Sequence, residues 1–145
     1  MPPPPGPSRS PTARAPVRLR GASAPGQAPP GWPVDVPPPG ADGWQARAAS
    51  WLLDVCPPDY RGHPVLARQP RVLARLAVLH ASAQLDGLRR AVATLRADLS
   101  DVVGPRVVDE ALAALEAERV RLLAVEEGAV LVERALAGAR VVPSL

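Results

Sequence analysis

The sequence predicts an all-α protein: a long antiparallel helical hairpin with a shorter N-terminal helix packed on its open half, preceded by a disordered proline-rich tail. Three observations predict this architecture. Apolar residues recur at alternating steps of three and four in two long segments, as on one helix face. A short break, residues 100–104, separates the two segments. Of the 20 prolines, 14 lie between Pro2 and Pro39, ahead of both segments.

The composition divides the chain into a tail at 1–40, a helical domain at 41–139 and a C-terminal tail at 140–145. The first 40 residues hold few large apolar groups, so burial cannot offset their ordering entropy. They carry four arginines against Asp35, a net charge of 4 − 1 = +3, while the remainder has 13 arginines against 13 acidic residues. The chain has no Lys, Ile, Asn or Phe, which a GC-rich genome explains, so arginine abundance alone is weak support for nucleic-acid binding.

The Trp32–Val36 strip follows the tail. In an extended backbone Trp32, Val34 and Val36 would alternate with Pro33 and Asp35 and face one side. One hypothesis is a docking strip for a partner, in the manner of proline-rich ligands. The other, which we favour, is that the strip lies along the protein's own hairpin.

The next element is a helix from about residue 42 to residue 55. Asp42 suits the N-cap, and Pro57 ends the helix because proline cannot continue its hydrogen bonding. Trp44, Ala48 and Trp51 recur at helical spacing. We expect the Trp44/Trp51 face to fill the open half of the hairpin, where both arms carry a second set of large apolar residues.

The first hairpin arm begins at Pro70, a residue suited to the first helical position. Its stripe consists of Ala74, Val78, Ala81, Leu85, Leu88, Val92, Leu95 and Leu99. The stripe of the second arm consists of Val108, Ala111, Leu115, Leu122, Val125, Ala129, Val132 and Leu136. Folding back at the break buries both stripes and sets Leu99 opposite Val108. The same register places Arg89 beside Glu118, so we predict an ion pair that helps to fix the register.

The half of the hairpin near the turn is rich in alanine. Ala93, Ala97, Ala114 and Ala117 flank a single narrow stripe there, and small side chains permit close helix approach. We therefore predict a helical interaction or assembly module that docks a protein partner or a second copy of itself. The predicted interface comprises these four alanines with Trp32, Val34, Val36, Trp44 and Trp51.

The alternative is a nucleic-acid-associated accessory protein that uses the arginine-containing tail and the basic end from Arg61 to Arg75. From Tyr60 to Leu85 there are four arginines and no acidic residue. Arg75 is level with Glu133 across the hairpin, however, so we expect part of this charge to be neutralised within the protein.

An enzymatic role is not predicted. Cys56, Asp59 and His63 form the one cluster of catalytic residue types, but Cys56 follows a helix C-terminus, where the helix dipole disfavours a thiolate. The sequence has no phosphate-binding glycine loop, no serine elbow and no zinc-ligand spacing. We therefore expect no cofactor, no metal and no small-molecule substrate. The absence of a signal-peptide core or a membrane-length apolar run predicts a cytoplasmic location.

The run from Trp51 to Gly62, with Pro64-Val65-Leu66 after it, resembles small conserved proteins of unassigned function from GC-rich actinobacteria. The resemblance covers roughly residue 32 to the C-terminus. It implies no activity, cofactor or partner.

Overall fold

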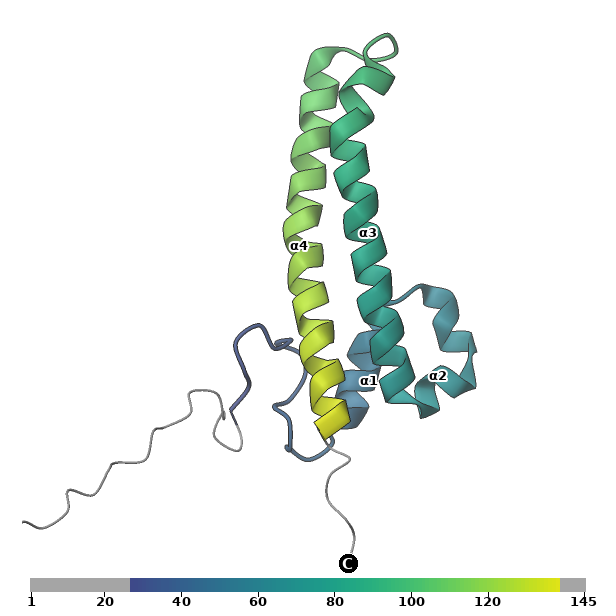
Figure 1. Ribbon diagram of the computed structural model, residues 1–145, viewed down its shortest axis with the longest axis vertical. Helices are drawn as coiled ribbons and strands as arrows, with labels where there is room; N and C mark the ends of the chain where they lie inside the picture. The colour runs from purple at the N-terminus through teal and green to yellow at the C-terminus, as the bar shows by residue number, and fades with distance from the viewer. Residues whose placement is uncertain (1–26, 139–145) are drawn as a thin grey trace, which may run out of the picture.

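The computed structural model describes residues 27–138 and is all-helical over that range, as predicted. Its elements are α1 (Trp44–Val55), the 3-10 helix η1 (Pro58–Gly62), α2 (Pro64–Arg68), α3 (Pro70–Leu99) and α4 (Pro105–Gly138). Helices α3 and α4 lie side by side as a long hairpin, with α1 and α2 at its base (Figure 1). Residues 1–26 of the tail predicted at 1–40, and the C-terminal tail predicted at 140–145, lie outside the described residues.

The hairpin has the predicted ends and register. Helix α3 begins at Pro70, and residues 100–104 join it to α4. Two ion pairs link the arms: Arg75 Nη1 lies 3.9 Å from Glu133 Oε1, and Arg96 Nη2 lies 2.8 Å from Asp109 Oδ1. These pairs stand near opposite ends of the hairpin, so the two arms keep one register along their length.

The main core lies at the base of the hairpin. Leu52 of α1, Leu73 of α3 and Val132 of α4 are its largest fully buried side chains. Helix α1 packs mainly on α3 and less on α4. Trp44 is buried and Trp51 is half-buried, so the predicted face of α1 does cover the open half of the hairpin.

The start of α1 differs from the prediction. Gly43, not Asp42, occupies the N-cap position, and no side chain caps the helix. Gly43 has a φ of 72°, a left-handed backbone that glycine adopts without steric cost. The chain therefore turns tightly through Asp42 and enters the helix at Trp44.

The Trp32–Val36 strip is part of the folded unit, which corrects the predicted boundary at residue 40. Two β-turns bracket it: Trp32 N–H donates to Pro29 O at 3.0 Å, and Ala41 N–H donates to Pro38 O at 3.1 Å. The third residue of each turn is a glycine with positive φ, Gly31 at 82° and Gly40 at 90°. Proline followed by glycine is the signature of a type II turn. These turns bring a proline-rich segment back onto the hairpin.

The sequence predicts an extended strip, but the strip forms a turn. Val36 N–H donates to Pro33 O at 3.1 Å, which closes a turn with Val34 near its tip. Trp32 and Val36 consequently point into the core, whereas Val34 is 98% exposed. The prediction that the three side chains share one side is wrong for Val34.

Candidate interaction surfaces

The aromatic residues of the predicted interface belong to the protein's own core. The rings of Trp32 and Trp44 lie with centroids 6.0 Å apart at an interplanar angle of 55°. Trp32 Nε1–H donates a buried hydrogen bond of 2.9 Å to Val36 O, so the indole has its polar partner inside the protein. Of the two hypotheses for the strip, packing on the protein's own hairpin is the one observed.

The four alanines of the predicted interface are all exposed. Ala93, Ala97, Ala114 and Ala117 lie on the distal arm, the part of the hairpin at residues 86–121 that extends beyond Leu85 and Leu122. The distal arm has no helix other than α3 and α4 within the described part of the chain. Figure 1 shows it standing clear of α1 and α2.

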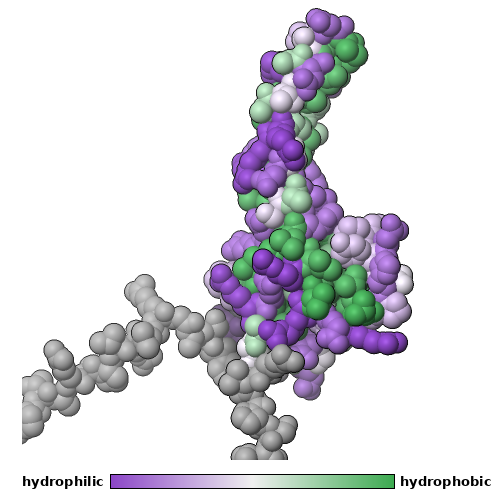
Figure 2. All heavy atoms as spheres, turned by 45° about the vertical axis from the view of Figure 1, so that its right-hand side comes forward, coloured by the Kyte–Doolittle hydropathy of each residue, from purple (hydrophilic) through white to green (hydrophobic). Residues whose placement is uncertain are grey.

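Burial in the distal arm is thin. Between Leu85 and Leu122, Val108 is the one buried side chain of the described structure. Four valines there expose about half of their surface or more: Val92, Val102, Val107 and Val120. Figure 2 shows hydrophobic residues reaching the surface near the free end of the hairpin. An amphipathic pair of helices normally buries such residues against further structure.

The predicted ion pair between Arg89 and Glu118 does not form. Arg89 Nη1 donates to Asp86 Oδ1 at 2.6 Å, and Arg121 Nη2 donates to Glu118 Oε1 at 2.5 Å. Each partner lies three residues away in the same helix, and helical neighbours meet with little ordering of their side chains. The hydrogen bonds from Arg121 lower the pKa of Glu118. The two arms are held in register elsewhere, by the ion pairs of Arg75 and Arg96.

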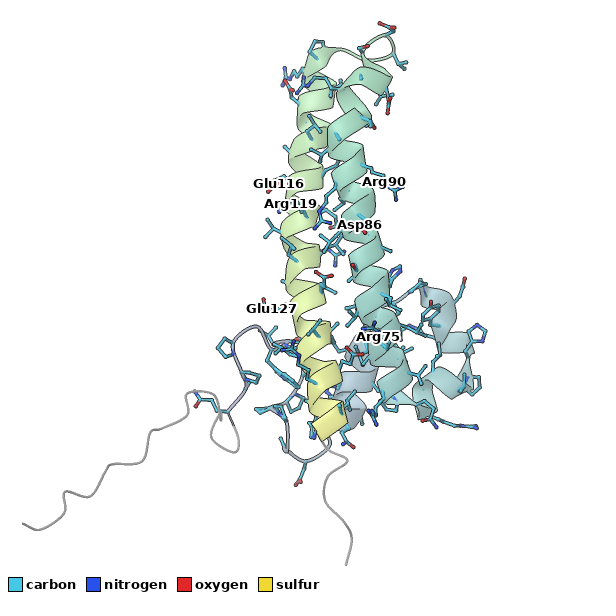
Figure 3. All side chains as sticks on the ribbon, viewed as in Figure 1. Arg75, Asp86, Arg90, Glu116, Arg119 and Glu127 are labelled. Atoms are coloured by element: carbon cyan, nitrogen blue, oxygen red, sulfur yellow. The ribbon has the colours of Figure 1, made fainter. Side chains whose placement is uncertain are left out.

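The predicted basic end is partly neutralised within the protein. Arg61 contacts Asp54, and Arg75 lies near Glu133, as the sequence indicated for the second pair. Arg68 and Arg71 form no ion pair within residues 27–138. Figure 3 shows Arg75 at the base of the hairpin, whereas Arg90, higher on α3, points away from α4.

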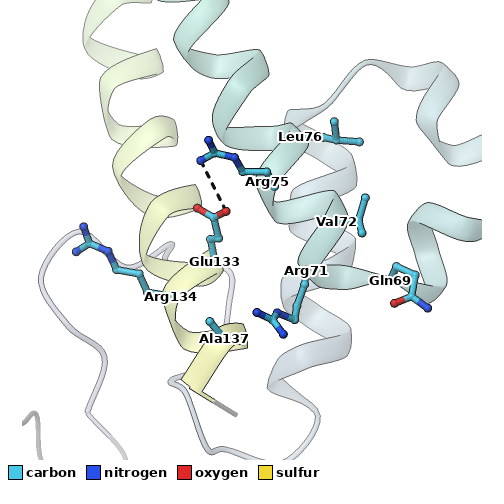
Figure 4. A pocket seen from close by; sticks show the side chains of 8 residues that line it. All are labelled: Gln69, Arg71, Val72, Arg75, Leu76, Glu133, Arg134 and Ala137. Atoms are coloured by element: carbon cyan, nitrogen blue, oxygen red, sulfur yellow. Dashed lines mark ion pairs between the residues drawn. The ribbon is translucent and has the colours of Figure 1, made fainter. Parts of the chain in front are cut away.

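A hollow of about 680 Å³ lies at the base of the hairpin between the start of α3 and the end of α4. We call it the basal groove; its lining includes Arg71, Val72, Arg75, Leu76, Glu133 and Arg134. Arg71 and Arg75 reach from α3 toward α4, and Glu133 points back toward α3 (Figure 4). Arg134, which follows Glu133 and is distant in sequence from Arg71, was not among the predicted site residues. The predicted pairing of Arg75 with Glu133 was the one sequence feature that could have placed Arg134 near this groove.

Cys56, Asp59 and His63 differ in their exposure to solvent. Cys56 is buried, and burial raises the pKa of its thiol, so the thiolate is disfavoured. Asp59 and His63 are exposed on and beside η1. Among the described residues, no group of three His, Cys, Asp or Glu side chains is placed to hold a metal ion.

No helix within residues 27–138 combines the length and apolar character needed to span a bilayer. Comparison with known protein families, curated proteins and solved structures gives no match for this chain. The resemblance to actinobacterial proteins and the cytoplasmic location therefore stay predictions.

Proposed function

We propose that this protein is a helical interaction module, and that the distal arm docks a second pair of helices from a partner protein or another copy of the chain. The observation that carries the proposal is that residues 86–121 contain one buried side chain, Val108, while four valines in the same stretch are exposed. The base of the hairpin has α1 packed against it, and no element within residues 27–138 covers the distal arm in the same way.

Two helices without further packing gain little stability from burial. Most helical stability in proteins comes from burying an amphipathic face, not from intrinsic propensity. A docked helical pair would cover Val92 and Val107, and each buried CH₂ group contributes about 0.8 kcal/mol. Association would thus stabilise the part of the hairpin that gains least from the core.

The alanines fit the geometry of a four-helix bundle. Helix axes pack 8–10 Å apart depending on the side chains between them, and small side chains allow the closest approach. Ala93 and Ala97 lie one turn apart on α3, and Ala114 and Ala117 lie within one turn on α4. A partner helix can therefore approach either arm closely.

The experiment is sedimentation of the full chain over a range of concentrations, combined with hydrogen exchange. We expect self-association, with amides of the distal arm exchanging faster than those of the basal core in dilute protein and slowing on association. Ala114→Glu would place a charge on the docking surface and is expected to abolish association. The control is Ala46→Glu on α1, which is also exposed but lies outside the distal arm.

The two possible partners are separated by the same measurements. Association of the purified chain that Ala114→Glu prevents and Ala46→Glu does not indicates a second copy. If the pure chain stays monomeric, binding should appear with a captured host protein and show the same dependence on Ala114. A dilute monomer whose distal arm is as protected as its basal core would refute the proposal, because no stabilising partner would then be needed.

Nucleic-acid binding remains the weaker alternative. Arg61 and Arg75 already face carboxylates of the same chain, which leaves Arg68 and Arg71 of the four predicted arginines. The test is a DNA mobility shift at increasing salt, since phosphate contacts weaken steeply as salt rises.

A further inference from the structure

The arginines of the basal groove differ in their hydrogen bonding from most of those along the hairpin, Arg90 excepted. On the hairpin, carboxylates accept hydrogen bonds from Arg89, Arg96, Arg106, Arg119 and Arg121. In the groove, the guanidinium groups of Arg71, Arg75 and Arg134 donate no hydrogen bond to another residue of the described chain. Each guanidinium has five N–H donors, so the groove presents many donors to an incoming ligand.

The groove also has too little negative charge to balance these arginines. Glu133 is the one acidic residue among its lining side chains. It lies 3.9 Å from Arg75, which is too long for a hydrogen bond. Arg71 and Arg75 are four residues apart on α3, so their side chains leave the same helix face about 5–6 Å apart. Like charges at this spacing repel each other unless an anion lies between them.

The groove is not purely polar. Val72 and Leu76 contribute to its lining, and Val72 is about half exposed. Leu79, a further turn along α3, is also half exposed, and Figure 2 shows a hydrophobic area at the base bordered by hydrophilic side chains. A ligand that matches this surface carries negative charge and an apolar group within one helical turn of each other.

We propose that the basal groove binds an acidic segment of a partner protein, with two carboxylates on Arg71 and Arg75 and an apolar side chain against Val72. Carboxylates match the forked guanidinium geometry and form strong charge-assisted hydrogen bonds. A nucleic-acid backbone would make no use of the apolar lining, whereas a peptide can place an apolar side chain against it. This site is separate from the distal arm, so it stands or falls independently of the proposed function.

The experiment measures the binding of a fluorescein-labelled peptide of Glu-Glu-Leu repeats to the full chain by fluorescence anisotropy. We expect Arg71→Glu to weaken binding about tenfold or more, because it replaces an attraction by a repulsion. Arg90→Glu is the matched control: Arg90 is an exposed arginine of the same helix that also lacks an ion pair in the described structure, and its substitution should change the Kd less than about twofold.

A third variant, Glu133→Gln, should strengthen peptide binding where Arg71→Glu weakens it. Glu133→Gln removes the carboxylate that competes for Arg75, so we expect it to tighten peptide binding several-fold. A groove residue with a purely structural role would not improve binding when substituted. Circular dichroism checks that each variant is folded, and Arg71→Gln serves as a milder substitution with the same expected direction.

Four results would each overturn the proposal. The first is equal weakening by Arg71→Glu and Arg90→Glu, which would indicate attraction to net charge alone. The second is equal binding of a Gln-Gln-Leu peptide, which would remove the carboxylates from the recognition. The third is displacement of the peptide by inorganic phosphate at similar concentration, which would indicate a general anion site. The fourth is tighter binding of oligothymidylate than of the peptide, which would assign the groove to nucleic acid.

Discussion

Substitution of Gly128 by alanine tests how closely the proline-rich strip and α1 pack on α4. A Cβ added at Gly128 would lie 3.1 Å from Pro33 Cγ and 3.2 Å from Trp51 Cη2. Carbon atoms in favourable contact are about 3.5–4.0 Å apart, so Pro33 and Trp51 must both retreat. Pro33 is held in place because Trp32, beside it in the chain, is buried and hydrogen-bonded to Val36 O.

Helix propensity and steric crowding have opposite effects on the stability of the Gly128→Ala variant. Replacing a glycine inside a helix by alanine stabilises the helix by about 0.8–1.0 kcal/mol. Forcing a methyl group into a closely packed site costs about 1–3 kcal/mol. The expected net effect of Gly128→Ala is therefore a loss of stability of up to about 2 kcal/mol, with a near-neutral result at the lower limit of the steric cost.

Gly87 of α3 provides the matched control. It also lies inside a long helix, but nothing stands within 4 Å of a Cβ added there. Gly87→Ala should therefore stabilise the protein by the whole difference in helix propensity between glycine and alanine, about 1 kcal/mol. Because the chemical change is identical, the difference between the two variants, about 1–3 kcal/mol, measures the steric cost at Gly128 alone.

The assay is urea unfolding of both variants, followed by circular dichroism and extrapolated to zero denaturant. Tm from thermal unfolding provides a second measurement. If Gly128→Ala stabilised the protein as much as Gly87→Ala, Pro33 and Trp51 would not be packed on α4 as closely as the structure has them.

Three further predictions concern the core. Trp32→Phe should cost about 1–3 kcal/mol because it leaves the buried Val36 carbonyl without its donor, and a loss below about 0.5 kcal/mol in urea unfolding would contradict this. Leu52→Ala should cost about 2–5 kcal/mol, since Leu52 is fully buried between α1 and the hairpin; a Tm within about a degree of the parent's would argue against that packing. Cys56 should react slowly with iodoacetamide until urea unfolds the chain. Because burial raises its pKa in the folded state, the unfolded state loses the thiol proton first, and stability should fall as pH rises above about 8.5.

Much of the fold was predictable because it depends on local periodicity. The stripes of α3 and α4, the break at 100–104 and the start at Pro70 are all encoded in neighbouring residues. The Arg75–Glu133 pair then followed from the register of two regular helices. The distal arm was predictable for the same reason, since its alanines and its narrow stripe are features of sequence spacing.

The predictions that differ from the structure concern side chains with several competing partners or backbone conformations. The predicted register places Arg89 and Glu118 level across the hairpin, but each has a partner three residues away in its own helix. The strip was expected to be extended, but turns carry Trp32 and Val36 into the core. Composition alone marks that segment as proline-rich and does not show which side chains will be buried.

The hairpin of two long amphipathic helices could be predicted from the sequence, because helical period and chain reversal are properties of adjacent residues. Only the packing of the whole chain places Trp32 in the core and brings Arg71 and Arg134 into the lining of one groove. Those contacts join residues far apart in the chain, and they form only once the packing of α1 and the strip has set where each helix face lies.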